Sequence, residues 1–361
     1  MLKKKRTIKA FSDTGKSASL SREAWRRFRR NPLSIAGLGV IGLFFVIALL
    51  GYLITPDSTP FCNQQYLELG TLKPGSKTTF LCIDPKEEVG GSFLTGWPLP
   101  YTAIPIESCR IEGDSLHAIP LAGEPFTIDK SRLVEVKERT FLLGTDAYGR
   151  DVLSMIMIGS RVSLSVGLIA VLIALLIGIT LGALAAYHGG WVDNLIMWFI
   201  NVVWSIPTVL LVIAITFALG KGFWQVFIAV GLTMWVDIAR VVRGEVYSLK
   251  EKEFVTAARA LGFNTFRIIF RHILPNIAGA VIVVTASNFA TAILLEAGLS
   301  FLGIGVQPPM PSWGTMVKEN YSYILLDSAY LALLPGLAIM LIVLAFMLVG
   351  NGLRDALDIK S

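Results

Sequence analysis

The sequence predicts an all-α membrane protein with six transmembrane helices and a long extracytoplasmic insertion after the first helix. The first observation behind this is composition: of 361 residues, 54% are hydrophobic and only 16% charged, whereas a soluble chain carries about 25% charged residues. The second is that several uncharged runs reach the roughly 20 apolar residues that a helix needs to cross a bilayer. The third is the placement of Lys and Arg between these runs.

Six segments are the candidate crossings. A short one, 222–236, continues through Asp237 and Arg240, whose charges we expect at the level of the lipid headgroups. Pro207 is expected to kink the third span, and Gly178 and Gly182 let the second span approach a neighbour closely. The five full-length uncharged runs are 33–54, 162–187, 194–220, 273–295 and 328–353.

The distribution of Lys and Arg predicts the orientation. Of the 32 basic residues, 20 fall in the first 32 residues, the loop 240–271 and the tail after Leu353. Because short cytoplasmic loops carry an excess of Lys and Arg, both termini are predicted to be cytoplasmic. A cleaved signal peptide is the alternative for 33–54, but its core would be only about 7–15 apolar residues long.

These assignments divide the chain into five parts. They are a basic cytoplasmic segment 1–32, the first transmembrane helix 33–54, an extracytoplasmic insertion 55–141, a core 142–353 with spans two to six and a cytoplasmic loop 249–274, and a cytoplasmic tail 354–361.

The insertion holds all three cysteines, Cys62, Cys82 and Cys109. An oxidising exterior allows one disulfide, and sequence separation favours Cys62 with Cys82. A metal site that includes His117 would lack the ligand spacing of zinc sites, so no metal site is predicted. The insertion is either a small folded cap or a loose, variable loop.

The loop 249–276 predicts two short helices. The first covers about 251–261, Gly262 provides its left-handed end, Asn264 caps the second helix, and Pro275 opens the fifth span. Such a helix suits a groove in another protein, and a loop lying on lipid headgroups is an equal alternative. The apolar face of the first helix consists of Phe254, Val255, Ala258 and Leu261.

The few charges near the spans do not indicate catalysis. Asp237 and Arg240 are spaced to pair on one helix face, and Glu296 closes the fifth span. We interpret all three as anchors at the membrane interface, where charge is tolerated. The sequence offers no nucleophile with a base in reach, so no catalytic residue is predicted.

Three segments resemble the membrane subunits of ATP-binding-cassette importers, in the branch for dipeptides, oligopeptides and nickel. Two of them are 143–151 with the following 159–164, and 299–314. The third is the cytoplasmic loop, which resembles the family's EAA pattern, although Thr256 stands where Glu is usual and His272 where the general pattern has Ile. The residues that match this pattern in register are Ala257, Ala258, Gly262, Leu274 and Pro275.

The resemblance is closest to the second, C-type permease, and it implies a multi-pass protein of the bacterial inner (plasma) membrane. It implies half of the translocation pathway of an ATP-driven importer of di- or oligopeptides, with no enzymatic activity in this chain. The implied partners are a homologous second permease, two cytoplasmic ATP-binding subunits, an extracytoplasmic substrate-binding protein and the lipid bilayer, with no nucleic acid.

The same resemblance implies that ATP and Mg are bound by the partner ATPase subunits and that this chain binds no cofactor. A proton-coupled secondary transporter of small solutes is the alternative, and it requires ionisable residues in mid-span, which the sequence lacks. The residues implied to contact an ATPase subunit are Phe254, Val255, Thr256, Ala257, Ala258, Arg259, Leu261, Gly262, Leu274 and Pro275.

Overall fold

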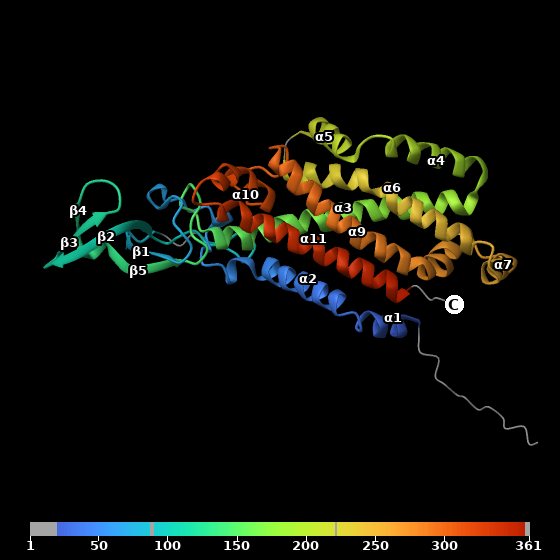
Figure 1. Cartoon of the computed structure of the whole chain (residues 1–361), viewed down its shortest axis with the longest axis horizontal. Helices are drawn as coiled ribbons and strands as arrows, with labels where there is room; N and C mark the ends of the chain where they lie inside the picture. Colours follow the sequence, from blue (N-terminus) through green and yellow to red (C-terminus); the bar gives the residue numbers. More distant parts are fainter. Residues whose placement is uncertain (1–19, 87–89, 221, 358–361) are drawn as a thin grey trace, which may run out of the picture.

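The computed structural model describes residues 20–86, 90–220 and 222–357, so parts of the segments 1–32 and 354–361 lie outside the described residues. The molecule is elongated, with a bundle of helices along its length and a β-sheet at one end (Figure 1). Five helices are long and apolar enough to cross a membrane, and a bent pair gives a sixth crossing if it counts as one span.

The long helices run side by side along the bundle (Figure 1). They are α2 (Pro32–Leu50), α3 (Val152–His188), α6 (Phe223–Leu249), α9 (Leu274–Phe301) and α11 (Tyr330–Leu357). The shorter helices are α1 (Leu20–Phe28), α4 (Gly190–Trp204), α5 (Thr208–Leu219), α7 (Glu253–Ala260), α8 (Thr265–Arg267) and α10 (Trp313–Asn320). As predicted, Gly178 and Gly182 face a neighbour closely, since a Cβ at either would overlap the α6 backbone.

The all-α prediction needs correction in the insertion, which contains a five-stranded antiparallel sheet in the order β4-β3-β2-β1-β5. Side chains of β1, which lies between β2 and β5, alternate between two apolar clusters, with Phe80 on one face and Leu81 on the other. The insertion is therefore a folded unit with its own core. The strands are β1 (Ser76–Ile83), β2 (Thr102–Glu112), β3 (Ser115–Pro120), β4 (Phe126–Asp129) and β5 (Leu133–Phe141).

The segment 143–151 joins the sheet end to the bundle. Arg150 forms buried ion pairs with Asp146 at 2.6 Å and with Glu319 of α10 at 2.7 Å. Asp151 caps α3, because its carboxylate accepts a hydrogen bond from the Ser154 backbone N–H at 3.0 Å. This motif thus has a structural role at the entrance to the second span.

The third predicted span is broken rather than kinked. Helices α4 and α5 meet at 91°, and the break falls at Pro207, which has no N–H to continue the helical ladder. The expected pairing of Asp237 with Arg240 is also corrected, because the guanidinium of Arg240 lies 4.2 Å above the ring of Trp204.

All three cysteines are free thiols in the structure, so the predicted bond between Cys62 and Cys82 is not formed. The Cys62 thiol donates a hydrogen bond to the carbonyl oxygen of Asp57 at 3.1 Å, and its side chain packs against the bundle. Cys82 lies in the core of the sheet. The two thiols therefore belong to different apolar clusters.

Candidate functional site

Helix α7 lies at the end of the bundle opposite the sheet (Figure 1). The helix runs from Glu253 to Ala260, slightly shorter than the predicted 251–261. As predicted, Gly262 then takes a left-handed conformation with φ +75°, which suits glycine. The N–H of Phe263 then returns to the carbonyl of Ala258 at 3.1 Å. Asn264 caps the next turn, since its side chain accepts from the Arg267 N–H at 2.8 Å. Local sequence signals therefore set the shape of this loop.

The predicted apolar face of α7 is divided. Val255 and Ala258 are buried and pack in the same cluster as Ile268 and Ile269 of the chain itself. Leu261 is 72% exposed and Phe254 is 40% exposed. The first pair therefore fixes the helix on the bundle, and only the second pair can meet a partner.

Two phenylalanines extend the exposed apolar surface of this loop. The rings of Phe266 and Phe270 lie 4.2 Å apart, and both side chains are more than half exposed. Exposed large apolar side chains gathered on one segment are typical of an interaction site. We call the four exposed side chains Phe254, Leu261, Phe266 and Phe270 the apolar edge.

Two contacts between a cation and an aromatic ring brace the loop, one to α3 and one within the loop itself. The guanidinium of Arg259 lies 5.1 Å from the ring of Tyr187 at the end of α3, and that of Arg267 lies 4.1 Å from Phe263. The other residues that were predicted to contact an ATPase subunit make none of these contacts. Thr256, Ala257 and Pro275 are exposed, and Leu274 is half-buried.

The fifth span does not begin at Pro275 as predicted. A continuous helix runs from Thr265 to Phe301, and its residues Ile268–Ile273 form a π-helical segment directly before the proline. The wider coil accommodates a ring that would otherwise clash with the carbonyl four residues earlier. From Thr265 on, the loop and the membrane span are therefore one helix, and the turn at Gly262 joins α7 to it.

A polar cluster lies inside the bundle around Glu296, which is fully buried rather than an interfacial anchor. Its carboxylate accepts hydrogen bonds from Ser163 of α3 at 3.1 Å and from Ser300 of α9 at 2.8 Å. Ser312, just before α10, donates to the Ser300 hydroxyl at 3.4 Å. The segment 299–314 thus connects three helices through this carboxylate.

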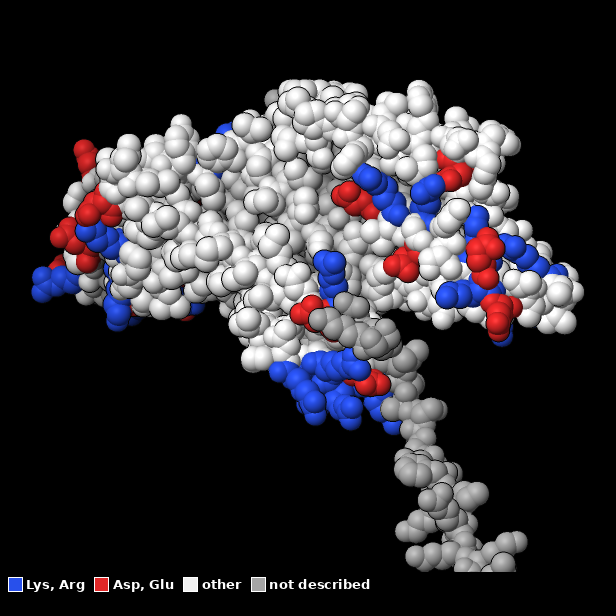
Figure 2. Space-filling model, turned by 45° about the vertical axis from the view of Figure 1, so that its right-hand side comes forward, with Lys and Arg blue, Asp and Glu red and all other residues white. Residues whose placement is uncertain are grey.

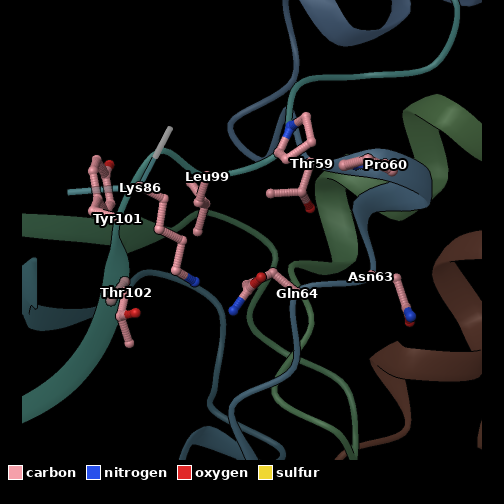
Figure 3. A pocket seen from close by; sticks show the side chains of 10 residues that line it. Thr59, Pro60, Asn63, Gln64, Lys86, Leu99, Tyr101 and Thr102 are labelled. Carbon is pink, nitrogen blue, oxygen red and sulfur yellow. The ribbon is translucent and has the colours of Figure 1, made fainter. Parts of the chain in front are cut away.

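A polar hollow of about 400 Å³ lies at the sheet end (Figure 3). Figure 3 shows the side chains of Lys86 and Gln64 pointing into it from different segments. Sequence reasoning missed this hollow because only the fold brings its segments together. Its other lining residues are Thr59, Pro60, Asn63, Pro98, Leu99, Tyr101, Thr102 and Ala103.

Comparison with known proteins identifies the family. Residues 178–360 match the family described as binding-protein-dependent transport system inner membrane component. The chain belongs to this transport family. Residues 19–74 also match the N-terminal transmembrane domain of oligopeptide transport permease C. The chain is therefore an ABC-importer permease of the dipeptide and oligopeptide family, a multi-pass protein of the bacterial inner membrane, as its three motifs indicated.

Named relatives of this permease come from several bacteria. A glutathione transport permease, GsiD of Pectobacterium atrosepticum, is 43% identical over 68% of this chain and 80% of its own length. A dipeptide transport permease, DppC of Alkalihalophilus pseudofirmus, is 35% identical over 94% of this chain and 90% of its own length. A chain of the inward-facing MetNI methionine ABC transporter aligns with a TM-score of 0.47 and 16% identity, over 56% of this chain and 97% of that one.

Proposed function

We propose that this permease forms half of the translocation pathway of an ATP-driven importer of small peptides, and that its loop 249–274 receives an ATPase subunit. The observation that carries the proposal is the apolar edge, which lies on a protruding loop. Its Phe266 and Phe270 belong to the helix that continues into a membrane span, and its other two side chains lie at α7. The relatives named for dipeptides and for glutathione, itself a short peptide, support the cargo class.

The packing of the bundle gives this loop a mechanical consequence. The helix from Thr265 to Phe301 is continuous, and α7 packs in one apolar cluster with its first turns through Val255 and Ala258. Displacement of the apolar edge by a partner therefore moves α9. The Glu296 cluster connects α9 to α3 and to the start of α10. Movement at α7 is thereby transmitted to the opposite end of the bundle, where cargo enters.

We further propose an orientation and a set of partners. The α7 end, with the segments 1–32 and 354–361, faces the cytoplasm and two ATP-binding subunits that hold ATP and Mg. The insertion 55–141 faces outward, toward a substrate-binding protein. A homologous second permease completes the pathway, and the exposed side chains of Trp198 and Phe217 on α4 and α5 are available for it or for lipid.

Substitution Leu261→Glu tests the docking role. Because this side chain is 72% exposed, the change places a charge on the partner surface without disturbing the core. In complexes reconstituted in vesicles with the ATPase subunits and the substrate-binding protein, we expect ATP-driven uptake of a labelled dipeptide to fall at least tenfold. Co-purification of the ATPase subunits should fall with it.

Leu121→Glu is the matched control for docking, since Leu121 is exposed directly after β3 at the distant sheet end, and co-purification of the ATPase subunits should be unchanged. Normal co-purification and uptake by the Leu261→Glu complex would contradict the docking role. Uptake driven by a proton gradient without ATP would instead support the alternative, a proton-coupled secondary transporter.

A further inference from the structure

A cluster of arginines surrounds α1 and the turn that follows it. Figure 2 shows a dense basic patch at this edge of the molecule, beside the start of the grey trace. Arg27 pairs with Glu23 at 2.8 Å. Within the described ranges no carboxylate pairs with the others. These four exposed arginines, which we call the arginine patch, are Arg22, Arg26, Arg29 and Arg30.

The patch has a fixed base on the bundle. Phe28 is buried beside Gly352 of α11, where a Cβ would contact its ring. Trp25 stacks on Phe28 with ring centroids 5.6 Å apart and stays half exposed. Arg22 and Arg26 are four residues apart on α1 and so share one side of that helix. Arg29 and Arg30 follow in the turn, and Figure 2 shows the basic side chains gathered on one face. The structure therefore holds four guanidinium groups on one outward side, beside an exposed indole.

The position of the patch along the chain places it at the membrane surface. Helix α2 begins at Pro32, directly after the Asn31 cap. Arg30 and Arg29 precede that start by two and three residues, at most roughly 7–11 Å along the chain. The polar headgroup layer is roughly 5–8 Å thick on each side. Only 11% of the apolar window of this span is buried in the chain, so lipid adjoins the patch.

We propose that the arginine patch binds the headgroups of anionic phospholipids. Guanidinium groups form paired hydrogen bonds with phosphate oxygens, and indole rings favour the membrane interface. Clusters of four or more basic residues directly beside a span are typical of surfaces that bind acidic lipids. Through Phe28, bound lipid holds the end of α11 at the membrane surface. The occupant is a lipid, because the patch is open and lies next to a lipid-facing span.

The test uses the full-length chain in detergent, titrated with fluorescent phosphatidylglycerol and with fluorescent phosphatidylcholine. A variant with Gln at all four positions of the arginine patch should bind phosphatidylglycerol at least tenfold more weakly at 0.1 M salt. Binding of phosphatidylcholine should not change. A variant with Lys at the same four positions should keep most of the preference, because long-range attraction needs charge, which Lys retains.

A matched control replaces four exposed basic residues at the sheet end, Lys86, Arg110, Lys130 and Lys137, with Gln. It should keep the lipid preference, and circular dichroism should show that all variants retain their helices. The proposal is overturned if the variant with four Gln in the patch still prefers phosphatidylglycerol, or if the sheet control loses the preference equally. Complete competition by millimolar inorganic phosphate would overturn it in favour of a free-anion site.

Discussion

At Gly149, just before α3, the absence of a Cβ allows the backbone of Tyr66 to approach closely. The residue has φ +72°, and a Cβ there would overlap the carbonyl oxygen of Tyr66. We expect Gly149→Ala to destabilise the protein by about 3 kcal/mol or more, because backbone strain and a clash with a main-chain atom add. The midpoint of thermal unfolding in detergent measures this effect.

Gly75 provides the control for backbone strain alone. It has φ +83°, and a Cβ there would meet nothing within 4 Å. Gly75→Ala should therefore cost only about 1–2 kcal/mol. Equal losses for the two substitutions would show that the close approach to Tyr66 contributes nothing.

The difference between local and long-range effects also explains which residue roles could be predicted from the sequence. Gly262 and Asn264 act through their own backbone and nearest neighbours, so their roles follow from residue type and position. Glu296 sits near the end of an apolar run in the sequence, but its burial depends on serines from two other helices. Val255 and Leu261 share a helix face in the sequence, and only tertiary packing separates the buried one from the exposed one.

At the scale of elements, the length of the uncharged runs predicted the long helices. It did not predict the break in the run 194–220 or the strands of the insertion. The uncharged run 194–220 is long enough for one straight span, but it contains Pro207 and breaks by 91°. In β5, Val134 and Val136 alternate with charged residues, a pattern typical of a strand. This short alternation was not used to predict strands in the insertion, so the sheet was missed.

The Glu296 cluster gives a prediction about how helices are held together. In Glu296→Ala, the buried hydroxyls of Ser163 and Ser300 lose their acceptor, which we expect to cost roughly 2–4 kcal/mol including the cavity. Glu296→Gln keeps the size and an acceptor oxygen, so its cost should be below about 1.5 kcal/mol. Thermal unfolding of the two purified variants measures the difference, and an equal loss in both would contradict the role of the hydrogen bonds.

At the scale of the whole molecule, the sheet and helix α7 lie at opposite ends of the bundle (Figure 1). A membrane around the bundle therefore separates them, whichever end faces the cytoplasm. The excess of Lys and Arg at the termini and in the α7 loop favours that end as the cytoplasmic one, as we propose. The cysteines allow a direct test, because all three belong to the insertion.

In spheroplasts, we expect a membrane-impermeant maleimide to label the native chain at Cys109, which is partly exposed. Cys62 and Cys82 should react slowly because they are buried, and burial also raises the pKa of the Cys62 thiol, which keeps it protonated. With Cys109 changed to Ser, a cysteine introduced by Glu251→Cys beside α7 should react only after the membrane is permeabilised. The reverse pattern would place the sheet in the cytoplasm, so the loop that we assign to an ATPase subunit would lie outside the cell.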